Sequence, residues 1–344
     1  MYSESDIDGA VAAGVMTPEA AAAFRNHIAS GRSAPAVDEE HFRLLTGFND
    51  IFVAIALVLT LTAIAWMGGR VVTWLGGASV AVAAWLFAEY FTKRRRMALP
   101  SILLVFAFAG GVAATQIGIL MELNLQHLPE RTAAMIGAGV AAITALATYI
   151  HWRRFMVPIT VAAGALALVG MAIGLVVAAF PETKNAIYPI TLAGGVLVFL
   201  LAMWWDMSDK ERRTRRSDVA FWLHLAAAPL IAHPIFHILG VFNTDVDATK
   251  AVIVLALYLA FAFVALAIDR RALLVSSLIY VLYAMYALFE QAGAVELSAA
   301  FTAFVIGSAL LTLSVFWHQM RAVVVGVLGG ARNWLPPVQT VVPA

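Results

Sequence analysis

The sequence predicts an all-α, polytopic membrane protein with ten transmembrane helices and with both termini in the cytoplasm. Three observations lead to this fold class. Hydrophobic residues make up 62% of the 344 residues and charged residues only 12%, whereas a soluble domain has about 25% charged residues. The apolar residues are gathered into ten long segments. The loops between these segments alternate between many cations and few.

Each of the ten segments is long enough to cross the bilayer, because a helix needs about 20 apolar residues to span the hydrocarbon core. The segments lie at approximately 49–68, 71–91, 100–122, 132–151, 156–180, 187–206, 218–241, 250–268, 272–291 and 297–317. They divide the chain into a cytoplasmic helical hairpin and linker (1–47), a ten-helix transmembrane domain (48–320) and an interfacial segment with an extended C-terminal tail (321–344). The first 47 residues contain no apolar core, so we expect no cleavable signal peptide.

Cationic side chains are distributed unequally between the two sides that ten spans define. The termini and the even-numbered loops hold 18 of the 22 Lys and Arg residues. The odd-numbered loops hold only Arg70, Arg131, Lys184 and Lys250. Cytoplasmic loops carry the excess of cations, so this distribution predicts that both termini lie in the cytoplasm.

Arginine pairs recur at the predicted inner ends of the helices. The pairs at 95–96, 153–154, 215–216 and 270–271 are 58, 62 and 55 residues apart, and each interval holds one out-and-back helix pair. The spacing indicates five tandem helical hairpins, although the preference for inner arginines would by itself produce it. Two inverted halves of five helices are the alternative, and this is also the layout of the drug/metabolite transporter superfamily.

Residues 6–31, DIDGAVAAGVMTPEAAAAFRNHIASG, are predicted to form two short helices. Gly14 suits a left-handed helix end, Thr17 is a good N-cap, and Pro18 suits the first helical position. Residues 30–40 form a polar linker. A hairpin of this size cannot bury a core alone, so we expect it to dock on the membrane domain or on a protein partner.

The stretches AGVMTPEAAAAF, HFRLLTGFNDIFVAIALVL and DRRALLVSSLIYVLYA together resemble a family of bacterial multi-pass inner-membrane proteins, catalogued mainly as a domain of unknown function. Its members begin with a short G-[aliphatic]-[aliphatic]-T-x-E-x-A helical hairpin. The resemblance implies a polytopic fold and a location in the bacterial cytoplasmic membrane. It implies no catalytic residue and no substrate.

Composition and motifs narrow the function classes. There are no cysteines, which removes disulfides, thiolate metal sites and cysteine nucleophiles, and the net charge of +1 offers no field for nucleic acid. We find no phosphate-binding glycine loop, nucleophile elbow or zinc motif, and we expect no cofactor. Glycine pairs at 68–69, 76–77, 110–111 and 194–195 fit close helix packing or loop ends. The basic stretch DKERRTRRSD (209–218) is expected to be a solvated inner loop that could also contact anionic lipid head groups.

Histidines and prolines are concentrated in FWLHLAAAPLIAHPIFHILG, residues 221–240. At 100° per residue, His233 and His237 share one face of this helix with Pro229, and His224 lies on another face. A pair spaced i,i+4 resembles half of a metal or proton site, although the metal is unknown and haem ligation is a remote reading. The simpler interpretation is that His233 bonds a carbonyl of a neighbouring helix and that His237 lies at the outer interface. We expect His224 to be a structural hydrogen-bonding residue.

Two other helices carry polar stripes that include ionisable groups. One holds Gln116 and Glu122, and the other holds Tyr280, Tyr283 and Glu290. We predict that His233, His237, Glu122 and Glu290 face an extracytoplasmic vestibule, with Tyr280 and Tyr283 lining its deeper part and Gln116 nearby. Ordinary helix packing through small residues and hydroxyl groups would also account for both stripes.

The sequence therefore favours a transporter-like or channel-like membrane protein for a small solute or cation. A non-transporting membrane scaffold or regulatory subunit, with the N-terminal hairpin as its docking element, is the second interpretation. An intramembrane enzyme is third. No acidic residue lies at the centre of a span, which argues against the commonest designs of proton- or sodium-driven antiport.

Overall fold

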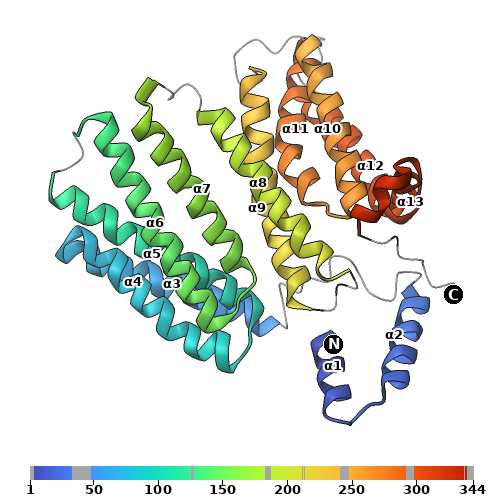
Figure 1. Cartoon of the computed structure of the whole chain (residues 1–344), viewed down its shortest axis with the longest axis horizontal. Helices are drawn as coiled ribbons and strands as arrows, with labels where there is room; N and C mark the ends of the chain where they lie inside the picture. Colours follow the sequence, from blue (N-terminus) through green and yellow to red (C-terminus); the bar gives the residue numbers. More distant parts are fainter. Residues whose placement is uncertain are drawn as a thin grey trace. The chain divides into compact units, whose positions relative to one another are not determined.

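The computed structural model describes residues 4–32, 48–124, 128–182, 187–210, 212, 214–240, 248–291, 298–336 and 338. Over these residues the chain is α-helical, with short 3-10 and π segments and no strand (Figure 1). The elements are α1 (Glu4–Ala12), α2 (Pro18–Arg32), α3 (Phe48–Val71), α4 (Thr73–Ala88), η1 (Glu89–Arg94), α5 (Ala98–Glu122), α6 (Glu130–Phe155), α7 (Ile159–Ala179), α8 (Ile187–Met207), α9 (Arg215–Ile238), α10 (Ala248–Ile268), α11 (Ala272–Gln291), α12 (Ser298–Val315), α13 (Trp317–Val327) and η4 (Gly329–Trp334).

A helix occupies each of the ten predicted segments, from α3 to α12. Among the described residues, seven helices are long and apolar enough to cross a membrane, and an eighth is counted if the bent pair α12–α13 forms one span. The described parts of α10 and α11 are shorter apolar helices. The structure thus fits an integral membrane protein, whereas ten spans, their orientation and the tandem hairpins stay predictions.

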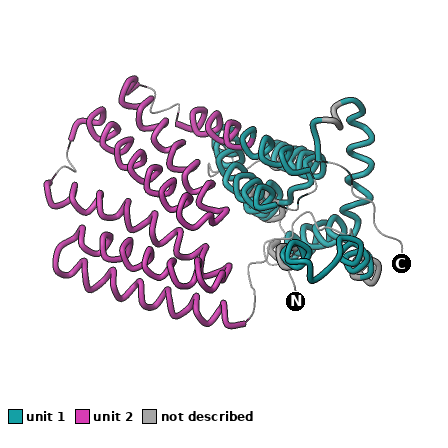
Figure 2. The backbone as a smooth tube through the Cα atoms, turned by 60° about the horizontal axis from the view of Figure 1, so that its bottom comes forward, with its two compact units in different colours: residues 1–41, 200–344 teal, residues 42–199 magenta. Residues whose placement is uncertain are grey.

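The chain forms two compact units, which Figure 2 colours separately. Unit 1 comprises residues 1–41 and 200–344, and unit 2 comprises residues 42–199. The division falls inside α8, so one continuous helix contributes to both units.

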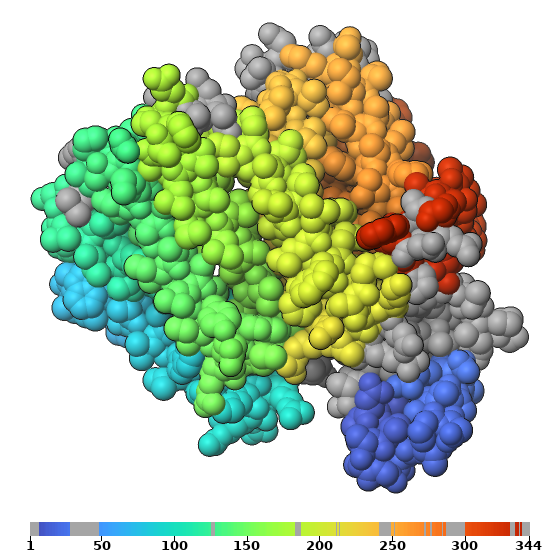
Figure 3. Space-filling model, in the orientation of Figure 1, coloured from blue at the N-terminus to red at the C-terminus, as the bar shows by residue number. Residues whose placement is uncertain are grey.

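Unit 2 is built from long helices that pack on their sequence neighbours. The α3, α4 and α5 helices share a core of Leu57, Leu61, Ala84, Ala88 and Leu104. The α6 and α7 helices lie against each other, and Figure 3 shows their side chains in contact along the visible face of this unit. Most residues of these helices are nevertheless not buried. In the 18-residue apolar stretch of each helix from α3 to α7, only 11–28% is buried inside the protein. Apolar surface of this extent requires lipid or another chain to cover it.

Unit 1 is organised around α9. In the 18-residue apolar stretch of α9, 56% is buried inside the protein, which is more than in the other six candidate spans. Two of its residues, Ala232 and Phe236, form a core with Val254 of α10, Val281 of α11 and Ile306 of α12. The α9 helix also runs through Pro229 and Pro234 as one helix. It is therefore the most buried of the seven candidate spans.

The glycine pairs of unit 2 allow helix backbones to approach closely, as the sequence predicted. A Cβ atom added at Gly77 would lie 2.8 Å from the carbonyl oxygen of Gly111, and one at Gly111 would lie 2.9 Å from that of Gly77. A Cβ at Gly118 would lie 2.5 Å from the Cα of Trp74. These contacts place α4 and α5 nearly backbone to backbone, which any side chain at the same positions would prevent.

The four loops that the sequence places inside share one backbone feature. Each contains a non-glycine residue with positive φ: Arg96, Met156, Arg212 and Asp269, at 52°, 55°, 52° and 61° respectively. A left-handed residue reverses the chain within a short loop at a cost of order 1 kcal/mol. Asn124, in a loop that the sequence places outside, also has φ of 53°, so this feature does not distinguish the two sides.

The N-terminal residues form the predicted helical hairpin. Gly14 has φ of 72°, and the backbone N–H of Ala20 donates to the Thr17 hydroxyl oxygen at 3.1 Å. Arg25 of α2 pairs with Asp8 of α1 at 2.8 Å. Val15 stays 82% exposed, so apolar surface remains for a docking partner. Most of the predicted linker lies outside the described residues.

The C-terminal end departs from the predicted extended tail. The α13 helix begins at Trp317, four residues before the predicted interfacial segment, after a bend of 77° from α12. Asn333 and Trp334 belong to η4 instead of an extended strand. Arg321 Nη2 then donates to the carbonyl oxygen of Pro336 at 2.7 Å. A buried arginine needs acceptors, and the tail turns back to provide one. The residues beyond Val338 lie outside the described part.

The contacts between α4 and α5 predict opposite results for two adjacent glycines. Gly111→Ala places a methyl group against the α4 backbone, and we expect it to lower stability by about 1–3 kcal/mol. Gly110→Ala is the matched control, since nothing lies within 4 Å of a Cβ there. It should be neutral or slightly stabilising, because alanine favours helix by about 1 kcal/mol over glycine. Thermal unfolding of the purified protein in detergent measures both, and equal melting temperatures would contradict the close packing.

Candidate functional site

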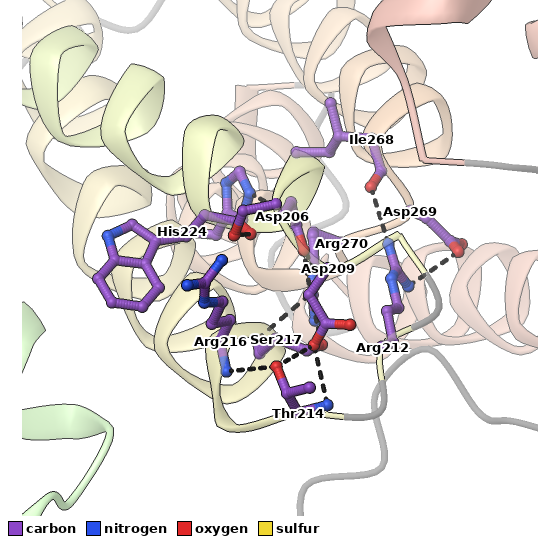
Figure 4. A network of polar contacts seen from close by, with 12 residues as sticks. Asp206, Asp209, Arg212, Thr214, Arg216, Ser217, His224, Ile268, Asp269 and Arg270 are labelled. Atoms are coloured by element: carbon purple, nitrogen blue, oxygen red, sulfur yellow. Dashed lines mark hydrogen bonds and ion pairs between the residues drawn. The ribbon is translucent and has the colours of Figure 1, made fainter.

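A buried ionic network joins the loop ends of α8, α9, α10, α11 and α13 within unit 1. Figure 4 shows its central residues. Asp206, near the end of α8, accepts hydrogen bonds from Nη2 and, at 3.2 Å, from Nε of Arg270, which lies in the turn between α10 and α11. On the other side, its Oδ2 lies 3.0 Å from Nε2 of His224 on α9. Asp206, His224 and Arg270 are each only 1% exposed.

Asp269 is the second carboxylate of this network. It accepts hydrogen bonds from Nη1 of Arg212 at 3.1 Å and from Nε1 of Trp317 at 2.9 Å. Nε of Arg321 lies 3.2 Å from Asp269 Oδ1 as an ion pair. Since Asp269 and Arg270 are adjacent in the chain, the two halves of the network are joined covalently. Arg271, the next residue, lies over the Trp317 ring at 4.8 Å.

The basic loop between α8 and α9 is folded into the network. This corrects part of the prediction that 209–218 is a solvated loop, because Asp209 and Arg212 are buried whereas Lys210, Arg215 and Arg216 are exposed. Arg212 is 8% exposed and Asp209 is 9% exposed. Burial, together with the nearby charge of Arg270, lowers the pKa of Arg212, and the carboxylates of Asp269 and Asp206 oppose this shift. The loop retains a charged arginine inside the protein because an acid of the opposite loop pairs with it.

Local hydrogen bonds fix the shape of the same loop. Asp209 Oδ2 accepts from the backbone N–H of Thr214 at 2.9 Å and from its hydroxyl at 2.6 Å. The Thr214 oxygen in turn accepts from the N–H of Arg216 at 3.2 Å and so caps α9. Capping satisfies one of the free donors at the start of this helix. The buried charges balance, because three acids (Asp206, Asp209 and Asp269) accompany three arginines (Arg212, Arg270 and Arg321).

Chemically, this arrangement is suited to holding helix ends together. Each of its buried acids and buried arginines has an oppositely charged or hydrogen-bonding partner. Within the described residues, no three His, Asp or Glu side chains gather closely enough to hold a metal ion. His224 makes the structural hydrogen bond that the sequence predicted. Its partner, Asp206, was not foreseen. The sequence does contain a signal for this pairing. An aspartate lies near three neighbouring helix ends on the predicted inner side, and the loops at these helix ends also contain arginine.

A second polar feature joins α9 to α11. His233 Nδ1 lies 2.9 Å from the Tyr280 hydroxyl, so His233 bonds a side chain of the neighbouring helix. The rings of His233 and His237 are 6.3 Å apart, and Tyr280 stacks on Phe236 at 4.4 Å. Both histidines are exposed at the surface of unit 1. Tyr283, one turn along α11, is 44% exposed. Four of the predicted site residues therefore lie on two adjoining helices.

The predicted site residues of unit 2 have partners of their own. Glu122 Oε1 accepts from the backbone N–H of Thr73 at 3.2 Å and from its hydroxyl at 2.7 Å. A carboxylate at the start of α4 is favourable for the helix dipole. Gln116 Nε2 lies 3.4 Å from the Thr144 hydroxyl and 3.5 Å from the Val140 carbonyl oxygen, both on α6. These contacts agree with the interpretation that the polar stripes serve ordinary packing between neighbouring helices.

The vestibule as a whole stays a prediction. Glu122 and Gln116 belong to unit 2, whereas His233, His237, Tyr280 and Tyr283 belong to unit 1. Glu290 lies in α11, but its side chain is outside the described part. The structure therefore brings His233 and Tyr280 together and does not test the convergence of the other residues.

Comparison with known proteins adds no family to this picture. No family model matches the chain, and no curated protein or solved structure is significantly similar to it. The resemblance of the N-terminal hairpin to a family of inner-membrane proteins consequently stays an expectation.

Removing one partner from the ionic network should be far more damaging than removing an exposed charge. Arg270→Met leaves Asp206 buried with only His224 opposite, and we expect a loss of about 3–5 kcal/mol. Lys210→Met is the matched control, since Lys210 is an exposed cation of the same loop region, and it should change stability by less than about 1 kcal/mol. Thermal unfolding followed by tryptophan fluorescence measures both. Similar shifts for the two variants would show that the network does not stabilise unit 1.

Proposed function

We propose that this chain is a multi-pass membrane protein that conducts or transports a small solute or cation, with the His233–Tyr280 pair on its path. The observation that carries this proposal is the position of the pair. His233 lies on the helix that forms the core of unit 1, and Tyr280 is the ninth of the 20 residues of α11. Tyr280 thus lies near the middle of α11, and His233 lies more than one turn inside the end of α9 at Ile238.

Exposure of His233 has an energetic consequence. A histidine that faces lipid at such a depth would leave a polar group without water, which costs free energy. Polar side chains within spans therefore face water, a cavity or another protein surface. An exposed group of His233, His237 and Tyr283 beside Tyr280 fits a hydrated surface better than a lipid-facing one.

The chemistry of these groups suits protons and small cations or polar solutes. An imidazole exchanges a proton near neutral pH, and its hydrogen bond to a phenol supplies a neighbouring donor and acceptor. Pro229 and Pro234 lack backbone donors, so they leave carbonyl oxygens of α9 without their usual helical partner. Such carbonyls are additional ligands for a cation where they border water.

A non-transporting scaffold is the alternative, and the ionic network is the observation that favours it. Asp206 and Asp269 are fully paired, and such pairing stabilises one arrangement of the helix ends. The N-terminal hairpin, with exposed Val15 and Phe24, would be the docking element in this case. The two functions differ in whether water reaches the His233 surface.

Cysteine accessibility tests for this water directly, since the chain contains no cysteine. A water-soluble thiosulfonate reacts with the thiolate, which forms in water. We expect His237→Cys and Tyr283→Cys to react at least about tenfold faster than Ile279→Cys in membranes, because solvation governs thiolate formation. Ile279 is the matched control, because it lies on α11 and is 67% exposed. When the reagent is added only to the outside, the reaction rate also shows which side of the membrane this surface faces. Equal, slow reaction at all three positions would support the scaffold.

Flux measurements test transport itself. In proteoliposomes with a trapped pH-sensitive dye and an imposed cation or proton gradient, the wild-type protein should accelerate dissipation of the gradient. His233→Gln and Tyr280→Phe should each reduce this rate at least about tenfold, the scale of one lost hydrogen bond to an ionisable group. His224→Gln and His27→Gln should retain it, since His224 serves Asp206 and His27 lies on the exposed face of α2. Equal loss in all four variants would contradict the assignment.

A further inference from the structure

We propose that the loop ends of α4 and α6 in unit 2 form a binding surface for the phosphate head group of an anionic phospholipid. Residues 89–96 and 149–158 together contain six cations and one carboxylate. The cations are Lys93, Arg94, Arg95, Arg96, Arg153 and Arg154. All six are exposed. This surface is independent of the proposed transport path.

One ion pair holds the two loop ends together. Arg154 of α6 donates to Glu89 through Nε at 2.6 Å and through Nη2 at 2.9 Å. Lys93 approaches the same carboxylate at 3.8 Å. Glu89 opens the π-helix η1, which ends the α4 segment. The only carboxylate of these two segments is therefore used for assembly and leaves a net positive surface.

Two of the remaining arginines are oriented without being neutralised. Arg95 Nη2 donates to the Tyr90 hydroxyl at 3.0 Å, and Arg153 Nη1 donates to the Tyr149 hydroxyl at 2.9 Å. Each guanidinium also lies within 6 Å of the same ring, at 5.5 Å and 5.9 Å. A phenol orients an arginine but leaves its charge available. Arginines held in this way lose less entropy when they bind an anion.

The surroundings of this surface favour a lipid over a soluble anion. It lies at the ends of two candidate spans, Thr73–Arg94 and Glu130–Phe155. Apolar side chains are exposed farther along the same helices, with Leu86 at 62%, Leu146 at 59% and Ile150 at 50%. A ligand with an anionic head and apolar chains is complementary to both parts. Basic clusters beside membrane helices attract anionic lipids by about 1 kcal/mol per cation.

Three arginines of unit 1 show that not every arginine near an inner helix end is exposed. There Arg212, Arg270 and Arg321 are buried and paired with Asp206 or Asp269. Arg94 and Arg96 of unit 2 have no such partner among the described residues. Two clusters of similar composition are consequently suited to different tasks, one to internal cohesion and one to an external anion.

Cross-linking of the wild-type protein tests the surface without substitutions. The full chain is placed in phosphatidylcholine nanodiscs that contain a phosphatidylglycerol analogue with a photoreactive group near its phosphate. After irradiation and digestion, we expect adducts in residues 86–100 and 146–158 that a matching phosphatidylcholine analogue does not give. The same distribution of adducts for both lipids would overturn the proposal.

Charge removal supplies the second measurement. Arg94→Gln/Arg95→Gln/Arg96→Gln should reduce phosphatidylglycerol retained in native mass spectra at least about tenfold. Lys210→Gln/Arg215→Gln/Arg216→Gln removes three exposed cations of unit 1 and should leave retention nearly unchanged. Equal loss in the two triple variants would mean general surface attraction and would overturn the site. Full competition by soluble glycerol phosphate would assign the surface to free phosphate compounds and would overturn the lipid. If the first variant does not fold, the cross-linking map decides alone.

Discussion

The pairing of Asp206 with Arg270 is the interaction on which unit 1 depends. Burying two charges costs several kcal/mol per ion, and only close pairing with further hydrogen bonds offsets that cost. Here the further bonds come from His224 and from Ser217, whose hydroxyl oxygen lies 3.2 Å from Arg270 Nη2. Any large displacement of α8, α9 or the α10–α11 turn would leave a charge unpaired. The network therefore fixes the mutual positions of these elements more strictly than apolar packing does, since apolar contacts tolerate small shifts.

The helices could be predicted from the sequence, but the partners of the charged side chains could not. Apolar length and helix-breaking loops are local properties, and they located α3 to α12 within a few residues. Arg270 was recognised as one of the arginines at the inner ends of the helices, yet its pairing with Asp206 joins positions 64 residues apart. Such pairing depends on which helix ends adjoin, and one sequence contains no local signal for it. His233 and Tyr280 were predicted to share a site because both lie on polar faces. The helical wheel gave the face but not the bonded partner.

The inner arginines illustrate why composition alone misled the interpretation of 209–218. Topology demands cations on one side of a membrane helix, but it does not specify whether they face water. In unit 2 the first of the consecutive arginines, Arg94, ends a π-helix, the last, Arg96, is itself the left-handed residue, and all three are exposed. In unit 1, Asp209 binds Thr214 and bends the loop back, so that Arg212 turns inward to Asp269. Asp209, three residues before Arg212, holds the shape of the loop that carries this buried cation.

The polar pair and the ionic network are carried by the same two helices. His224 and His233 are nine residues apart on α9, about 14 Å along its axis. Tyr280 lies on α11, which begins directly after Arg270 and Arg271. The network thus fixes the spacing of α9 and α11 at one end, and it determines how closely His233 and Tyr280 can approach farther along. A polar pair held in this way needs no movement of the helix ends to exchange a proton or to bind a cation. For this reason a rigid ionic base and an exposed His–Tyr pair are compatible with conduction along a fixed path, whereas transport by large rearrangement of α9 against α11 would require the buried charges to separate.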